Sequence, residues 1–511
     1  MTVTAPARPA ATGPPGPPAV LAPRNRGVWW VALAVTAVLL AFANRYGYHR
    51  DELYFLEAGK HLSWGYPDQP PLVPALARLL SAIGPNAVWV LRIPSALAAG
   101  ATILLTTALA RRLGGDQGAQ LLSAMSMGVA GLLLGADHYL NTSGFDLLFW
   151  TLLIWLVVVI LRTDRRELWL LVGLVGGIAL LNSDLPAIVM AAIVLAIVVV
   201  GPRQRVASPY VLIGGAIAVL IWLPYLIWQA RHGWPELTVS RAIANGSSAT
   251  STSRPMLVPE ALLQISPYLA PLWILGLVQL ARAPALRWCR SLALAFGIVL
   301  VIFEVTGGKS YYLATMVPVF LAAGSQPMLD WIRRGGRGAR TGTLIGLAIA
   351  GAINLVVTLP IIPAGDLHKT PIPALNTDPG ETVAWPTYVS QIARVYRSIP
   401  AGARAETVVF TKNYGEAGAI DRFGAAVGLP TAYSPHNGFW YWGLPPNHDH
   451  LAVVVGYSRH TLAHDFAYCT QAGTLNNGLH LNDTEQGSPI WRCAGMRESW
   501  SRLWPHLKEL G

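Results

Sequence analysis

Residues 143–161, with the sequence SGFDLLFWTLLIWLVVVIL, decide the fold class of this chain. Asp146 is the only charged residue in this stretch, and about 20 apolar residues in a helix are enough to cross the hydrocarbon core of a membrane. Of the 511 residues in the chain, 53% are hydrophobic and only 12% are charged, whereas about 25% are charged in a typical soluble domain. So few charges cannot cover a water-facing surface, and we therefore expect an integral membrane protein.

Ten further apolar runs flank this stretch, so the sequence predicts a polytopic α-helical membrane protein with about eleven transmembrane helices. The two runs at 168–200 are separated only by a short NSD break, which makes the helix count least certain there. The predicted spans lie near 28–44, 87–110, 117–135, 143–161, 168–183, 185–200, 209–228, 258–281, 291–306, 311–329 and 342–362.

Arginines gather in every second connection between these runs, and short connections of this kind face the cytoplasm in membrane proteins. The pattern predicts a cytoplasmic N-terminus and, with an odd number of helices, a C-terminus outside. The formal net charge of +11 follows from this arrangement, so we exclude nucleic acid as a partner. The basic connections carry Arg8, Arg24 and Arg26; Arg111 and Arg112; Arg162, Arg165 and Arg166; Arg203 and Arg205; Arg282, Arg287 and Arg290; and Arg333, Arg334, Arg337 and Arg340.

Composition divides the chain into three parts. Residues 1–26 are rich in alanine and proline and are expected to form a disordered cytoplasmic tail. The transmembrane domain is expected to occupy residues 27–363. Residues 364–511 contain no spanning run but hold strand-like pieces, TVVF (407–410) and LAVVVG (451–456). We expect them to form an extracytoplasmic α/β domain with a core of its own.

The richest chemistry lies directly after the first predicted span, in YGYHRDELYFLEAGKHLSWGYPDQPPL (46–72). This predicted outer loop places the adjacent carboxylates Asp51 and Glu52 at the membrane surface. Asp68 and several aromatic residues follow them. A sugar transferase needs a carboxylate to take a proton from the acceptor hydroxyl, and it needs aromatic faces for the sugar. The spacing alone equally fits a pair of solvated interfacial charges.

The run RDELYFLEAGKHLSWGYPDQPPL (50–72) resembles the first outer loop of the GT-C glycosyltransferases, and most closely the bacterial protein-mannosyltransferase and aminoarabinose-transferase superfamily (glycosyltransferase family 39 and its relatives). Two later regions are similar as well. They are GGKSYYLATMVPVFLAAG (307–324), and NYGEAGAIDRFG (413–424) with LPTAYSPHNGFWYWG (429–443). The resemblance spans almost the whole chain, but its motifs identify neither the donor sugar nor the acceptor.

The resemblance implies an inverting transfer of a sugar from a polyprenyl-phosphate donor to an acceptor protein, lipid or glycan on the outer face of the plasma membrane. Asp51 corresponds to the catalytic carboxylate and Glu52 to its partner, which we expect to hold the loop or a cation. Lys309 would lie near the donor phosphate, although a lysine at this boundary also fits a simple membrane anchor. The remaining site candidates are Arg50 and His61 at the phosphate, and Tyr54, Tyr66, Asp68, Asp146, Tyr311 and Tyr312 at the substrate.

The three cysteines predict one disulfide. Cys469 and Cys493 both fall in the domain that we place outside, where disulfides persist, whereas Cys289 falls in an arginine-rich cytoplasmic segment. A metal site is weakly indicated at most. His448 and His450 flank Asp449, but an H-x-H pattern alone is a poor zinc signature. A divalent cation as cofactor stays open.

Two other functions remain in competition with an enzyme. A transporter or flippase of a lipid-linked glycan would place ionisable residues in mid-membrane and show two related halves. Here the distinctive carboxylates lie in outer loops, and the halves look unrelated. An inactive relative that only binds glycans is the third reading, and the intact pair of Asp51 and Glu52 argues against it.

Overall fold

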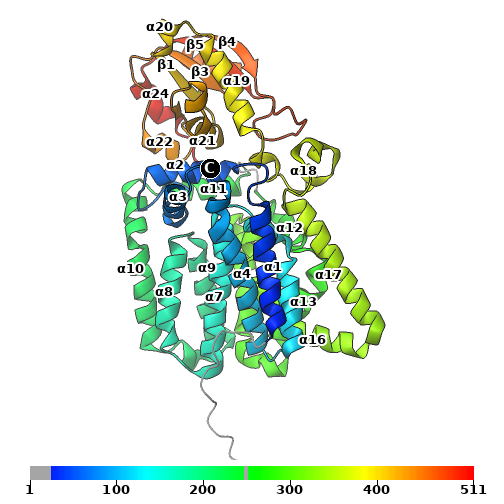
Figure 1. The fold of residues 1–511 in the computed structure, drawn as a ribbon. Helices are drawn as coiled ribbons and strands as arrows, with labels where there is room; N and C mark the ends of the chain where they lie inside the picture. The colour runs from blue at the N-terminus through cyan, green and yellow to red at the C-terminus, as the bar shows by residue number, and fades with distance from the viewer. Residues whose placement is uncertain (1–24, 247–250) are drawn as a thin grey trace, which may run out of the picture.

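The structure is a computed structural model, and it describes residues 25–246 and 251–511. The expected disordered tail therefore lies almost wholly outside the described residues. Figure 1 shows a bundle of helices with a smaller mixed domain seated on one of its ends. The chain is mostly helical, and its sheet lies in the C-terminal part, as the sequence predicts.

All eleven apolar runs form helices, because a backbone in hydrocarbon must satisfy its own hydrogen bonds. Three runs are interrupted. One breaks at Val129 and Ala130, another bends by 88° at Ser266, and the run at 311–329 breaks at Thr315 and Met316. The bundle helices are α1 (Arg26–Phe42), α4 (Val88–Arg112), α5 (Gln117–Gly128), α6 (Gly131–Ala136), α7 (Thr142–Thr163), α8 (Leu168–Leu180), α9 (Leu185–Val200), α10 (Pro209–Arg231), α12 (Leu257–Ile265), α13 (Ala270–Arg282), α14 (Ser291–Thr306), α16 (Val317–Arg334) and α17 (Gly336–Thr358).

The count of eleven spans is not confirmed. Among the described residues, four helices (α4, α7, α10 and α17) are long and apolar enough to cross a membrane alone, and the bent pair α12–α13 would make a fifth. Several other helices are apolar but shorter, with 10–17 residues. Apolar content marks where helices form, but it does not show where they break. Several helices are therefore shorter than the apolar runs that predict them.

The predicted inner and outer connections gather at opposite ends of the bundle (Figure 1). At one end the arginine-rich connections contact each other: Arg333 pairs with Asp116 at 2.6 Å, and Arg205 pairs with Asp164. At the other end lie the short helices that face the C-terminal domain. They are α2 (Arg50–Lys60), α3 (Leu72–Ile83), α11 (Pro235–Ala244) and α15 (Ser310–Ala314).

The C-terminal domain is built on a five-stranded sheet in the order β2-β1-β3-β5-β4. β1 is parallel to both β2 and β3, whereas β5 is antiparallel to β3 and β4. The strands are β1 (Thr407–Thr411), β2 (Ala432–Tyr433), β3 (Leu451–Val455), β4 (Phe466–Thr474) and β5 (Pro489–Met496). The helices are α18 (Ile372–Leu375), α19 (Trp385–Arg397), α20 (Ala401–Arg404), α21 (Tyr414–Phe423), α22 (Gly438–Trp442), α23 (Arg459–Asp465) and α24 (Trp500–Leu507).

The two faces of the sheet belong to different cores. Val408 and Phe410 of β1 pack with Trp500 of α24 on the outer face. On the other face, Val409 belongs to a core that also contains Leu53 of α2 and the helices α19 and α21. The domain is thus continuous with the membrane-surface helix α2 through apolar packing, which fixes its position over the bundle.

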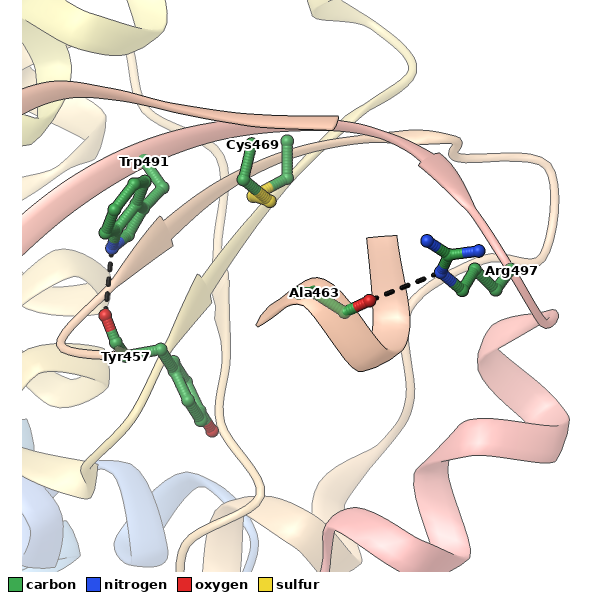
Figure 2. Close-up of a disulfide and its surroundings, with 6 residues drawn as sticks. Tyr457, Ala463, Cys469, Trp491 and Arg497 are labelled. Atoms are coloured by element: carbon green, nitrogen blue, oxygen red, sulfur yellow. Dashed lines mark hydrogen bonds between the residues drawn. A yellow bond between two sulfur atoms is a disulfide. The ribbon is translucent and has the colours of Figure 1, made fainter. Parts of the chain in front are cut away.

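Cys469 and Cys493 form a disulfide, the pairing that the sequence predicts. They are directly opposite each other on β4 and β5 (Figure 2). Trp491 on β5 donates a hydrogen bond to the carbonyl of Tyr457 at 2.9 Å, which ties the same strand to the loop after β3. Cys289 is a free, buried thiol in the bundle.

Candidate active site

Helix α2 begins at the junction between the bundle and the C-terminal domain, and its first turn carries both predicted catalytic carboxylates. His49 caps the helix: its Nδ1 accepts a hydrogen bond from the Asp51 N–H at 3.2 Å, and its own N–H donates to Glu52 Oε2 at 2.8 Å. Negative side chains are favourable at a helix N-terminus. Because successive residues of a helix point about 100° apart, the two carboxylates face different surroundings.

Glu52 points inward and is fully buried. Arg92 of α4 meets it with two bonds, from Nε to Oε1 at 2.9 Å and from Nη2 to Oε2 at 2.7 Å. The Leu140 N–H also donates to Oε1, at 3.0 Å, and Arg92 reaches the carbonyls of Ala43 and Gly47. With its oxygens engaged in this way, Glu52 joins the start of α2 to the Arg92 guanidinium of α4 and to the backbone at Leu140.

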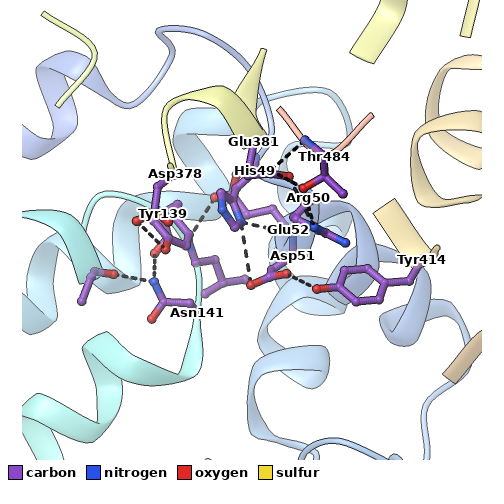
Figure 3. Close-up of polar contacts among 12 residues, drawn as sticks. His49, Arg50, Asp51, Glu52, Tyr139, Asn141, Asp378, Glu381, Tyr414 and Thr484 are labelled. Atoms are coloured by element: carbon purple, nitrogen blue, oxygen red, sulfur yellow. Dashed lines mark hydrogen bonds and ion pairs between the residues drawn. The ribbon is translucent and has the colours of Figure 1, made fainter. Parts of the chain in front are cut away.

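Asp51 points toward the space between the two domains (Figure 3). Its side chain is 36% exposed. Oδ1 accepts a hydrogen bond from the Tyr414 hydroxyl at 2.8 Å, and Oδ2 lies 3.8 Å from His49 Nδ1. Asp51 is therefore a held but accessible carboxylate, which is the state that a general base needs.

Tyr139 connects Asp51 with the segment that contains Lys309. The Tyr139 ring stacks on the His49 ring at 4.2 Å, and its hydroxyl donates to Asp378 Oδ2 at 3.3 Å. Burial raises the pKa of Tyr139, and its neighbours Asp378, Asp51 and Tyr311 raise it further. Tyr139 thus lies within electrostatic reach of both Asp51 and Tyr311.

Lys309 directly precedes α15 and is its N-cap residue. Lys309 is 9% exposed, and its Nζ lies 5.7 Å from the centre of the Tyr311 ring. The Tyr311 and Tyr312 rings meet edge to face at 4.8 Å. A buried cation beside aromatic rings is suited to a phosphate that carries an apolar tail.

Arg50, which is predicted to lie at the donor phosphate, contacts the C-terminal domain. Its Nη1 lies 3.4 Å from Glu381 Oε2 and 3.4 Å from the Thr484 hydroxyl, both in that domain. Its guanidinium also lies over the Tyr414 ring, 4.8 Å from the centre. Arg50 therefore links the start of α2 to the C-terminal domain, and its role at the donor phosphate stays a prediction.

Tyr54 and Asp68 form a second polar cluster beside Asp51. The Tyr54 hydroxyl donates to Asp68 Oδ1 at 2.8 Å, and Asn437 Nδ2 donates to Asp68 Oδ2 at 3.2 Å. The Gly438 N–H donates to the Tyr54 oxygen at 3.0 Å. Burial raises the pKa of Asp68 to about 7, and the charge of Asp51 adds to this effect. Asp68 thus links the first outer loop to the C-terminal domain.

His61 and Tyr66 are not placed at the catalytic carboxylate. His61 ends α2, about 15 Å along the helix from Asp51. Its ring stacks on Trp442 at 4.9 Å, and its Nε2 lies 3.6 Å from Glu57 Oε1. The Tyr66 hydroxyl donates to the Ala58 carbonyl at 2.9 Å inside the loop. His61 thus packs against Trp442 of the C-terminal domain, and its role at the donor phosphate stays a prediction. Tyr66 supports the loop.

Asp146 is buried near the start of α7, and two residues of the NSD break (182–184) donate hydrogen bonds to its carboxylate. Its Oδ1 accepts hydrogen bonds from Asn182 at 2.9 Å and from the Ser183 hydroxyl at 2.8 Å. In the same break, Asp184 Oδ2 accepts from the Tyr225 hydroxyl at 3.1 Å. The break between α8 and α9 thus satisfies a carboxylate that apolar surroundings would otherwise make costly.

Sequence reasoning missed four residues that shape the site: Arg92, Tyr139, Tyr414 and Asn437. Arg92 had a signal, because a charged residue inside an apolar run calls for a partner. Tyr414 and Asn437 lie within the two segments quoted for the resemblance, but their distance from Asp51 along the chain hides the contact. As for metals, no group of three or more His, Cys, Asp or Glu residues in the described part of the chain is arranged to hold an ion.

Known glycosyltransferases resemble this chain in part of its sequence and in its fold. Residues 68–228 match the family model of dolichyl-phosphate-mannose-protein mannosyltransferases. No curated protein matches the chain in sequence. The structure of ArnT from Cupriavidus metallidurans bound to undecaprenyl phosphate superposes with a TM-score of 0.57 at 15% identity, covering 91% of this chain and 97% of that one. The chain has the GT-C fold.

Two other GT-C structures share less of their length with this chain. The oligosaccharyltransferase AglB from Archaeoglobus fulgidus, solved with an inhibitory peptide and a dolichol-phosphate, gives a TM-score of 0.51 at 12% identity, with 79% of this chain and 64% of that chain covered. The mycobacterial arabinofuranosyltransferase AftD gives a TM-score of 0.50 at 14% identity, with 93% and 40% covered. The predicted resemblance to GT-C glycosyltransferases is thus confirmed, and a membrane location fits both the fold and the apolar helices.

Proposed function

We propose that this chain is an inverting glycosyltransferase that moves a sugar from a polyprenyl-phosphate donor to an acceptor on the outer face of the plasma membrane. The observation that carries the proposal is Asp51, an accessible carboxylate held at the junction of the bundle and the C-terminal domain. The solved structures of ArnT and AglB, which share the fold, contain undecaprenyl phosphate and dolichol-phosphate respectively. The acceptor would enter from the water side of this junction.

The proposed reaction has one proton transfer and one displacement. Asp51 takes the proton of the acceptor hydroxyl or amine as the acceptor atom bonds to the anomeric carbon. The bond from that carbon to the phosphate oxygen breaks, and the polyprenyl phosphate leaves with the electron pair. The acceptor attacks opposite the leaving group, so the anomeric configuration inverts.

Lys309 would assist the departure of the polyprenyl phosphate in this reaction. Lys309 is buried directly before α15, and its Nζ lies 5.7 Å from the centre of the Tyr311 ring. A fixed cation stabilises the charge that builds on the phosphate as the glycosidic bond breaks. The aromatic pair Tyr311 and Tyr312 would line the path of the lipid or sugar.

The proposal is tested with purified protein in nanodiscs and a panel of polyprenyl-phosphate hexoses and pentoses, including mannose, arabinofuranose and aminoarabinose. Mass spectrometry follows the release of polyprenyl phosphate in the presence of cell-envelope extract as acceptor. We expect one donor to be consumed, and Asp51→Asn to lower its consumption by about a hundredfold or more, the scale of a lost general base. Equal consumption by the wild type and Asp51→Asn would contradict the proposal.

A comparison of cell-envelope glycans, glycolipids and glycoproteins with and without the gene identifies the acceptor. A lost sugar on one class of molecule would name both substrate and product. An accumulated, unconsumed lipid-linked glycan on the inner leaflet alone would favour a flippase instead.

A further inference from the structure

The only side-chain hydrogen bond to Asp51 described in the structure comes from the C-terminal domain. The Tyr414 hydroxyl donates to Asp51 Oδ1 at 2.8 Å across 363 residues of sequence (Figure 3). Tyr414 is the first residue of α21, and the Asn413 side chain caps this helix by accepting from the Glu416 N–H at 2.9 Å. Glu416 Oε2 in turn accepts from the Asn413 N–H at 3.2 Å. The capping box fixes the start of α21 and therefore the place of Tyr414.

Small residues let α21 lie directly against α2. A side chain at Gly418 would meet the Leu53 backbone at 3.2 Å, and one at Gly415 would meet the Arg50 Cβ at 3.3 Å. The two helices therefore approach closely at the turn that carries Asp51. This packing belongs to the core shared by the two domains, so the position of Tyr414 is set by the fold.

Two rings and one cation surround Tyr414 and restrict its orientation. The Arg50 guanidinium lies 4.8 Å from its ring centre, the Tyr54 ring lies at 4.9 Å, and the His436 ring lies at 4.9 Å. Burial raises the pKa of the Tyr414 hydroxyl, against an opposing effect of Arg50, so the phenol keeps its proton at neutral pH. It acts toward Asp51 as a hydrogen-bond donor.

The bond has a geometric consequence for a carboxylate that acts as a base. It fixes the rotamer of Asp51, which leaves Oδ2 for the acceptor. A general base must lie within hydrogen-bond reach of the proton that it takes, and a fixed rotamer keeps Asp51 in place for that transfer.

We propose that Tyr414 is a positioning residue for Asp51, so that the C-terminal domain completes the active site instead of only covering it. This inference rests on the proposed function of Asp51 as general base. Tyr414 does not touch the reacting atoms, and its effect passes through Asp51.

Tyr414→Phe tests this proposal, because it keeps the ring, the contact with Arg50 and the packing but removes the hydroxyl. We expect sugar transfer to fall by about tenfold, the scale of a lost hydrogen bond to a charged group. The loss should appear in kcat and leave the KM of the donor unchanged, because the hydroxyl holds Asp51 and not the donor. Tyr388→Phe is the matched control, since Tyr388 is a tyrosine of the same domain that donates to Asp483 at 2.8 Å, away from Asp51.

A second measurement does not need sugar transfer. Carbodiimides react with accessible carboxyl groups, so peptide mass spectrometry of Asp51 labelled at one fixed pH reports how freely its carboxylate is presented. The extent of labelling should rise in Tyr414→Phe, because no hydroxyl then occupies Oδ1, and stay unchanged in Tyr388→Phe. Unchanged labelling in Tyr414→Phe overturns the inference, whether or not the donor panel reveals a transferase. Conversely, increased labelling together with full transfer by Asp51→Asn overturns the proposed function and leaves the contact between the domains in place.

Discussion

Glu52 and Arg92 form a bidentate ion pair between α2 and α4 that is closed to solvent, with side chains 0% and 1% exposed. The Leu140 N–H also donates a hydrogen bond to Glu52. Arg92 donates to the carbonyls of Ala43 and Gly47. It therefore joins the first helix, the first outer loop, α4 and the second outer loop at one point. The catalytic candidate Asp51 directly precedes Glu52 in the chain, so its position depends on this pair.

The first prediction concerns the stability that depends on this pair. Glu52→Gln leaves the Arg92 charge buried without a counter-charge, and we expect a loss of about 3–5 kcal/mol in the free energy of unfolding. Denaturant titration in detergent measures it. Glu167→Gln is the control, since Glu167 pairs with Arg165 at the surface at 2.8 Å and such pairs contribute at most about 1 kcal/mol. Equal losses in the two variants would show that the buried pair is not a support of the fold.

The second prediction concerns the disulfide between Cys469 and Cys493. The link closes a loop of 24 residues in the chain, which in the chain-entropy account contributes about 3 kcal/mol. Thiol labelling of the denatured, non-reduced protein should find one reactive thiol, that of Cys289, and labelling after reduction should find three. Three reactive thiols before reduction would contradict the pairing.

Much of the bundle could be predicted from the sequence, because lipid imposes a simple rule on apolar segments. A run such as 143–161 becomes α7 (Thr142–Thr163) almost residue for residue. The breaks could not be predicted in the same way. At Ser266 the backbone takes a positive φ of 147° ahead of Pro267, and a hydropathy pattern carries no sign of that turn. The number of complete spans depends on such breaks.

The site was predictable where it depends on neighbours in sequence and hidden where it depends on the fold. Asp51 and Glu52 were expected to have separate roles, since adjacent residues of a helix do not share a face, and the structure separates them. The donors to these carboxylates come from Tyr414 and Arg92, which are distant along the chain. Arg50 and His61 also contact residues of the C-terminal domain, Glu381 and Trp442, and their sequence neighbours give no sign of these contacts.

The third prediction concerns the donor phosphate. Lys309→Ala should lower the turnover of the polyprenyl-phosphate donor sharply, by about a hundredfold, because the leaving phosphate loses a fixed cation. Lys309→Arg should retain part of the activity, since the charge survives with a different geometry. Arg254→Ala is the control, a cation near the same end of the bundle that is exposed. Wild-type turnover in Lys309→Ala would contradict a role at the leaving phosphate and would leave Lys309 as a membrane anchor.

The fourth prediction concerns the sidedness of the membrane. Contacts such as Arg333 with Asp116 and Arg205 with Asp164 place the arginine-rich connections together, at the end opposite the C-terminal domain. Basic connections face the cytoplasm. A reporter that is active only outside the cytoplasm should therefore be active when fused after residue 370, and inactive when fused after residue 205. Activity in the opposite pattern would place Asp51 on the cytoplasmic face and remove the proposed outer acceptor.

The last prediction concerns the pH dependence of the junction between the domains. Burial raises the pKa of Asp68 to about 7, from an ordinary value of 3.8. Between these two values the folded protein binds a proton at Asp68 that the unfolded chain has lost, so the stability should fall as pH rises from about 4 to about 7. Asp68→Asn cannot titrate and keeps an oxygen for the Tyr54 hydroxyl. The decrease in Tm across this range should therefore be smaller in Asp68→Asn than in the wild type. Part of the decrease should remain, because burial also raises the pKa of Glu416 to about 7. Asp366→Asn is the control: a hydrogen bond from Lys369 lowers the pKa of Asp366, so its titration lies below this range. A wild-type pH dependence in Asp68→Asn would show that Asp68 is ionised in the folded protein throughout, and that its bond with Tyr54 joins a charged carboxylate to a phenol.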